Sequence, residues 1–77
     1  MKTNHTPVYR YYCPYRPPDL GAVPRGAVNV TFYPVKSDLV ALPGREAYGH
    51  ADYDHPLTQK SIDDYELIPH PANPIQS

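Results

Sequence analysis

The sequence predicts an α+β fold, namely a small antiparallel β-sheet of three or four strands with one short helix and a long proline-rich loop. Residues 27–33 and 46–53 alternate their side chains in the manner of strands. Residues 58–66 follow a proline and carry the signals of a helix start. Residues 14–26 hold four prolines and two glycines, which predict the loop. With 77 residues, the chain has room for one small domain.

The first strand is predicted over residues 7–12 (PVYRYY), which are rich in β-forming side chains. Alternation places two sets on opposite faces: Val8, Arg10 and Tyr12, and Tyr9, Tyr11 and Cys13. We expect Cys13 to be a small core residue. As the single cysteine it cannot form a disulfide within the chain, which favours a reducing compartment.

The loop at residues 14–26 is where we expect function to lie, because long loops inside small domains are often functional. Tyrosine and arginine on a stiff, proline-rich backbone suit a protein pocket or a nucleic acid. The plain structural alternative is that Tyr15 packs over the loop and Arg16 pairs with an acidic residue of the other half. The predicted binding residues are Tyr12, Tyr15, Arg16, Pro17, Pro18 and Arg25.

The second strand is expected over residues 27–33 and to end at Pro34, which lacks an amide hydrogen. Two sets of side chains follow from its alternation: Val28, Val30 and Phe32 pointing inward, and Asn29, Thr31 and Tyr33 pointing outward. We expect turns at residues 37–38 and 43–44, with a brief strand or an apolar loop plug at residues 39–42.

Residues 46–69 predict a strand, a short helix and an extended exit. The strand has Ala47, Gly49 and Ala51 on one face and Tyr48, His50 and Asp52 on the other. At the helix start, Thr58 is a good N-cap, and Leu57 and Ile62 match a hydrophobic staple. We expect one domain over residues 7–69, with flexible tails at residues 1–6 and 70–77.

The charges are unevenly distributed, although the net charge is only −1. Residues 1–38 carry five basic and two acidic side chains, whereas residues 39–77 carry two basic and six acidic ones. We expect the two halves to attract each other in the fold, and the alternative is a polar binding surface. One group of carboxylates could mimic phosphates, namely Asp52, Asp54, Asp63, Asp64 and Glu66. The simpler explanation is that these side chains are solvated and that those near the helix N-terminus favour the helix dipole.

The first residues contain no apolar run typical of a signal peptide, and no stretch is long and apolar enough to span a bilayer. We therefore expect a cytoplasmic protein without a membrane partner.

His50, Asp52 and Asp54 recur at every second residue, with His55 beside them, a pattern that could bind a divalent metal or supply an acid and a base. Strand alternation places polar side chains on the wet face, so we expect these residues to be solvated. The sequence has no glycine-rich phosphate loop, nucleophile elbow or paired-cysteine zinc motif. We therefore predict no enzyme activity, no cofactor and no metal.

Three motifs resemble a known family: Tyr15-Arg16-Pro17-Pro18, Val23-Pro24-Arg25-Gly26 and Tyr65-Glu66-Leu67-Ile68-Pro69. Over most of residues 8–69 the chain is similar to a small large-polyvalent-protein-associated domain, a type found on phages and mobile elements of gut Firmicutes. The activity of that family is unassigned. The resemblance therefore implies a setting in mobile-element conflict or transfer, and it implies no site residues.

The residues and the resemblance together predict a non-enzymatic protein-binding accessory module of a phage or mobile genetic element. In one version this module inhibits a host defence system, as an anti-CRISPR-type protein does. The alternative is a nucleic-acid-binding accessory protein that uses Arg10, Arg16 and Arg25 with nearby tyrosines. A weaker hypothesis is a metal-dependent hydrolase at His50, Asp52 and His55. Eight tyrosines on so small a body could leave an exposed patch, so a homodimer is also open.

Overall fold

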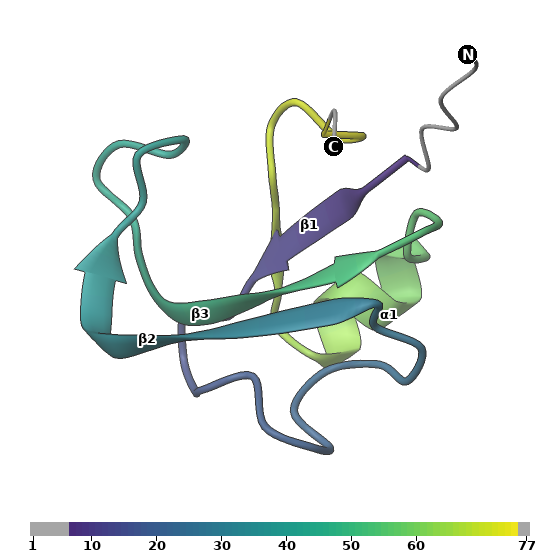
Figure 1. Cartoon of the computed structure of the whole chain (residues 1–77), viewed down its shortest axis with the longest axis horizontal. Coiled ribbons are helices and arrows are strands. Elements are labelled where there is room, and N and C mark those ends of the chain that lie inside the picture. Colours follow the sequence, from purple (N-terminus) through teal and green to yellow (C-terminus); the bar gives the residue numbers. More distant parts are fainter. Residues whose placement is uncertain (1–6, 76–77) are drawn as a thin grey trace, which may run out of the picture.

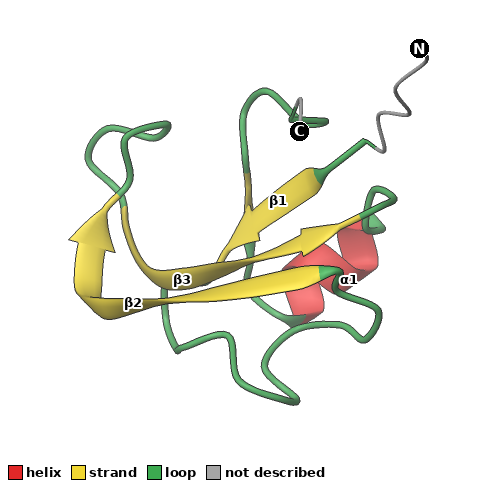
Figure 2. Cartoon of the chain, in the orientation of Figure 1, coloured by secondary structure: helices red, strands yellow, loops and turns green. Residues whose placement is uncertain are grey.

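The computed structural model describes residues 7–75. In this part of the chain, four strands form one sheet, and one short helix packs against one side of it (Figure 1). The elements are β1 (Tyr9–Tyr12), β2 (Asn29–Asp38), β3 (Glu46–Tyr53), α1 (Gln59–Asp64) and β4 (Ile68–Pro69). All pairings are antiparallel, and the strand order is β2-β3-β1-β4. Figure 2 shows the loop from β1 to β2 passing below the sheet in this view. The predicted class, with a four-stranded antiparallel sheet and one short helix, is confirmed.

The two central strands, β1 and β3, are covered on both faces. On the helix side, Tyr11, Cys13 and Tyr53 belong to one apolar cluster. On the opposite side, Tyr12 packs with Leu39, which follows β2 and acts as an apolar plug. The two faces predicted for the first strand are therefore confirmed, and so is the core position of Cys13, which is 2% exposed.

β2 is longer than the sequence predicted, because Pro34 lies inside the strand and does not end it. A proline is tolerated here since β2 is an edge strand, where an amide on the open side needs no partner. A bulge between Phe32 and Ser37 bends the strand, and Figure 1 shows its end turning away. The expected turn at residues 37–38 is wrong because both residues still pair with β3. The chain reverses at residues 39–45 instead.

α1 begins directly after Thr58, as predicted, and the Thr58 hydroxyl oxygen accepts a hydrogen bond from the amide of Ser61. Leu57 and Ile62 both pack against the core cluster, as the staple pattern predicted. The helix ends at Asp64, two residues earlier than expected, and Tyr65 is its C-cap. The next residue, Glu66, has a positive φ of 56°. Within residues 7–75, no helix has the length and apolar character needed to cross a membrane.

Residues 70–75, which the sequence assigned to a flexible tail, lie beside β1. The amide of His70 donates a hydrogen bond to the carbonyl oxygen of Arg10. The side chain of Asn73 accepts a hydrogen bond from the Arg10 amide and donates one to the Arg10 carbonyl oxygen. The prediction concerned mobility and stays a prediction, and the remaining residues of the two predicted tails lie outside the described range.

Candidate functional site

The loop between β1 and β2 is fixed to the sheet at two points. The ring of Pro18 is buried against Gly49 of β3, where an added Cβ atom would lie 2.8 Å from the Pro18 Cγ atom. Further along, the Tyr53 hydroxyl donates a hydrogen bond of 2.5 Å to the carbonyl oxygen of Pro24. Because Gly49 and Tyr53 both belong to β3, the loop is held across one face of the sheet.

The loop and β2 form an open hollow of about 720 Å³, which we call the apolar hollow. Val30 and Phe32 of β2 line it together with Tyr65, and the loop supplies the rest of the wall between residues 18 and 27. Asp19 and Arg25 are the charged members of this lining. The remaining wall consists of apolar side chains, glycines and the Tyr65 ring.

The β2 side chains at the apolar hollow lie on the predicted face but are not buried. The register places Val30 opposite Ala51 and Phe32 opposite Gly49, so both are on the core face. The prediction of burial is wrong: Val30 is 37% exposed and Phe32 is 53% exposed, and Val28 is exposed too. The reason is that α1 has only six residues and packs against β1 and β3, so it does not cover β2.

Three of the predicted binding residues lie apart from the apolar hollow. Tyr15, Arg16 and Pro17 are all exposed. Tyr15 borders a second, smaller hollow of about 270 Å³, which it shares with Lys36 and Arg45. Polar and charged side chains dominate that second hollow, so it differs in character from the first.

The other three predicted binding residues divide between the apolar hollow and the core. Pro18 and Arg25 both line the apolar hollow, although Pro18 is buried and Arg25 is exposed. Tyr12 is only 6% exposed, and its ring contacts the rings of His50 and His70. Tyr12 is therefore a core residue and does not belong to the exposed surface.

Two of the three arginines considered for nucleic-acid binding are engaged with carboxylates. Arg10 donates two hydrogen bonds to Asp52, at 2.8 and 3.1 Å. Arg16 pairs with Glu66 from the other half of the chain, as the plain structural alternative predicted. Arg25 has no carboxylate partner within residues 7–75. One of the three guanidinium groups is thus left for an external anion.

The acidic group that the sequence singled out is dispersed in the fold. Asp52 is buried, whereas Asp64 pairs with Lys60 one turn earlier on the helix and Asp63 accepts a hydrogen bond from Gln59. Asp52, Asp63 and Asp64 therefore each have a separate partner in the fold.

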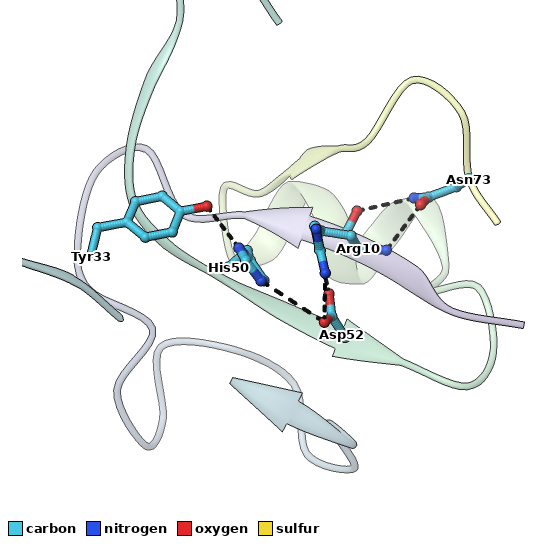
Figure 3. Close-up of polar contacts among 5 residues, drawn as sticks. All are labelled: Arg10, Tyr33, His50, Asp52 and Asn73. Atoms are coloured by element: carbon cyan, nitrogen blue, oxygen red, sulfur yellow. Dashed lines mark hydrogen bonds and ion pairs between the residues drawn. The ribbon is translucent and has the colours of Figure 1, made fainter. Parts of the chain in front are cut away.

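A buried polar network occupies the face of the sheet opposite the helix (Figure 3). His50 and Asp52 were expected to be solvated, but they are 8% and 4% exposed, so this prediction is wrong. The strand alternation was right. However, Arg10 from β1 binds Asp52, and the Tyr33 hydroxyl from β2 lies 2.7 Å from His50 Nδ1. Partners from neighbouring strands, which the local sequence does not show, cover this face.

Burial sets the ionisation of the network. Burial, followed by the charge of Arg10, lowers the pKa of His50 below its ordinary value, so the imidazole is neutral at pH 7. The hydrogen bond to Asp52 raises the pKa of Arg10, and burial raises the pKa of Tyr33. A neutral His50 carrying its proton on Nε2 lets Nδ1 accept from the Tyr33 hydroxyl while Nε2 faces Asp52 at 3.9 Å. The network therefore holds one ion pair beside two neutral rings.

The structure gives no metal centre in the part of the chain that it describes. Within residues 7–75, no three histidine, cysteine, aspartate or glutamate side chains are grouped to hold a metal ion. His55 pairs with the neighbouring Asp54 on the surface.

Burial raises the pKa of the Cys13 thiol to about 11, so Cys13 is not a thiolate nucleophile at neutral pH.

Sequence reasoning missed most of the apolar hollow. Leu20, at the tip of the loop, is fully exposed, Phe32 was expected to point inward, and Tyr65 was not considered as a binding residue. Two signals could have found the site. Leu20 stands between aspartate and glycine, which are turn residues that place a side chain at the surface. Residues 26–35 carry no charged side chain, although residues 29–35 belong to the edge strand β2.

The comparisons with known proteins give one match. The profile of a family described as defence against restriction A C-terminal matches residues 6–72, a range that includes the apolar hollow, the four strands and the helix. Neither the curated proteins nor the solved structures gave a match. The match supports the resemblance seen in the sequence only at a coarser level, as a small domain of the phage and mobile-element type. The family that matches is not the large-polyvalent-protein-associated family named from the sequence. The chain belongs to the defence against restriction A C-terminal family.

Proposed function

We propose that this chain is a non-enzymatic, protein-binding accessory domain that helps a phage or other mobile element to withstand host restriction. The family description supplies the setting. The observation that carries the protein-binding part is the apolar hollow, in which Leu20, Val30 and Phe32 remain exposed. Exposed apolar side chains gathered in a concave surface mark a binding site, since leaving them in water is unfavourable.

The chemistry of the apolar hollow favours a protein partner. Its wall is mainly apolar, with Asp19 and Arg25 as the charged side chains, which resembles the apolar centre and polar rim of a protein interface. Nucleic-acid binding depends on several cations that neutralise phosphates. Arg10 and Arg16 already neutralise Asp52 and Glu66, which weakens the nucleic-acid alternative.

Restriction is the defence system that the family description names, so we prefer it to the anti-CRISPR version of the hypothesis. The partner is then a protein of the restriction machinery or a protein of the element itself. In either case the partner presents apolar side chains that enter the apolar hollow.

A restriction-challenge assay tests the proposal. A mobile element carrying this gene is transferred into a restricting host and into a matched non-restricting host, and the efficiency of transfer is compared. Leu20→Glu places a charge in the apolar hollow, whereas Val40→Glu changes an equally exposed side chain on the β2–β3 loop, outside that hollow. We expect Leu20→Glu to lose protection in the restricting host and Val40→Glu to keep it. Full protection by Leu20→Glu would contradict the proposal.

A capture experiment then separates protein binding from nucleic-acid binding. The tagged chain is recovered from host lysate with and without nuclease, beside Leu20→Glu and a Tyr15→Ala/Arg16→Ala variant. A partner that survives nuclease and is lost with Leu20→Glu supports the apolar hollow. Loss only with Tyr15→Ala/Arg16→Ala moves the site to the neighbouring exposed residues. Partners that disappear with nuclease favour the nucleic-acid alternative.

A further inference from the structure

The first half of β2 is an unprotected sheet edge. β2 ends the strand order, so the outer side of its backbone has no neighbouring strand within residues 7–75. Every second residue of an edge strand points its amide and carbonyl groups outward, where they can pair with another strand. This half therefore offers free hydrogen-bonding groups next to the exposed side chains of Val30 and Phe32.

The usual devices that block edge pairing are confined to the other half of β2. Pro34, the bulge and Lys36 all lie after Phe32. By contrast, residues 26–35 carry no charged side chain, in a chain with 15 charged residues. A neutral edge has no repulsion against an identical copy of itself, whereas a charged edge repels its own kind.

The alternation of β2 makes this edge complementary to itself. Two copies that pair antiparallel in one sheet are related by a two-fold axis perpendicular to that sheet, so each face stays on its own side. A pairing centred on Val30 places Val30 opposite Val30, with Phe32 two residues along on the same face. Four apolar side chains, Val30 and Phe32 of each copy, then lie on one face, where opposite and diagonal neighbours make cross-strand contacts.

We propose that two copies of this chain associate through the Asn29–Phe32 edge of β2, joining two four-stranded sheets into one of eight strands. The occupant of the edge is thus a second copy. Because the axis is perpendicular to the sheet, the two apolar hollows open on the same face of the joined sheet, and a partner with two equivalent segments can engage both. The inference does not depend on the proposed function.

The test begins with the mass of the purified chain in solution, from light scattering and sedimentation over a range of concentrations. We expect a concentration-dependent dimer. Val30→Lys puts two ammonium groups together at the centre of the pairing and is expected to give a monomer. Val35→Lys changes another exposed valine of the same strand, beyond Pro34, and is expected to remain dimeric. A monomer at every concentration overturns the proposal and leaves the edge to an extended segment of a different protein.

A cysteine variant keeps the test decisive if Val30→Lys does not fold. Opposite residues of antiparallel strands have Cα atoms about 4.5–5.5 Å apart, within the range of a disulfide. We expect Val30→Cys to form a covalent dimer under mild oxidation and Val40→Cys not to do so. The native Cys13 is buried and should not interfere. Equal cross-linking at both positions, or none at position 30, contradicts pairing through β2.

Discussion

The ring of Pro18 lies against Gly49, in the space that a side chain at position 49 would occupy. Gly49 does not have a positive φ, so the close approach of the Thr31 carbonyl oxygen of β2 and of the Pro18 ring, and not the backbone conformation, requires glycine here. Gly49 also pairs with Phe32 of β2. The loop, the central strand and the exposed edge strand therefore meet at one residue.

We expect Gly49→Ala to lower the free energy of unfolding by about 1–3 kcal/mol, as overpacking of a filled site does. The new Cβ atom overlaps the Thr31 carbonyl oxygen and meets the Pro18 ring at 2.8 Å. Chemical denaturation measures the change. The double variant Gly49→Ala/Pro18→Ala should recover the part of the loss that is due to Pro18. No recovery in the double variant, or an unchanged denaturation midpoint for Gly49→Ala, would contradict the docking of the loop on β3.

Tyr53→Phe tests the second attachment of the loop. Removing the hydroxyl leaves the Pro24 carbonyl oxygen without its partner, and we expect a loss of about 1–2 kcal/mol. Protease sensitivity of the loop should rise at the same time. Tyr15→Phe removes a hydroxyl from an exposed ring and serves as the control. Equal effects of the two variants would contradict a fixed loop.

The buried hydroxyl of Tyr53 should also make the free energy of unfolding decrease at alkaline pH. Burial raises its pKa from 10.0 to about 12, so the unfolded chain releases the phenolic proton at a lower pH than the folded chain. The free energy of unfolding should therefore fall as the pH rises from about 10 to about 12. In Tyr53→Phe, this part of the alkaline loss should be absent.

Local signals in the sequence predicted the elements whose stability is local. The Thr58 cap and the Leu57 and Ile62 contacts depend on residues within one helical turn, and they place α1 nearly correctly. The two faces of β1 follow from simple alternation. The prediction that β2 ends at Pro34 was wrong because the free-energy cost of a proline in a strand depends on whether that strand is central or at an edge. The position of β2 in the sheet is decided by the order of strands that are far apart in the sequence.

The candidate site was harder to predict because burial depends on what covers each face. His50 and Asp52 alternate as a solvated face would, yet Arg10, 42 residues before Asp52, covers them. Val30 and Phe32 alternate as a core face would, yet the helix is too short to reach them. In both cases alternation predicts correctly which side chains share a face of the strand. Whether that face is exposed to solvent depends on residues from other parts of the fold.

His50 gives the fold a pH dependence on the acid side. Its pKa is lowered in the folded chain, so the unfolded chain binds a proton first as the pH falls below 6.5. The free energy of unfolding should decrease with falling pH through this window and level off below the folded pKa. His50→Gln should flatten this slope, whereas His55→Gln, at an exposed histidine, should keep it. The readout is the slope of stability against pH, so a general loss of stability in His50→Gln does not affect it.

The ion pair between Arg10 and Asp52 is unequally buried, and this predicts unequal effects. The Arg10 side chain is 31% exposed, whereas that of Asp52 is 5% exposed. Asp52→Asn leaves a guanidinium that can still reach water and still donate to the amide oxygen. Arg10→Met leaves a buried carboxylate without its cation, which costs about 3–5 kcal/mol in comparable pairs. We therefore expect Arg10→Met to destabilise the chain much more than Asp52→Asn.

The same two variants should also move His50 in a predictable way. Burial, followed by the charge of Arg10, lowers the pKa of His50, and the charge of Asp52 raises it. In Arg10→Met burial still lowers the pKa of His50, but the charge of Asp52 is no longer opposed by that of Arg10, so NMR titration should show a higher His50 pKa than in the unaltered chain. A protonated His50 then serves as the nearest cation to Asp52, and the acid-side loss of stability should shrink. If Asp52→Asn is instead the more damaging change, or if the His50 pKa falls in Arg10→Met, then Arg10 is not the group that makes the buried carboxylate tolerable.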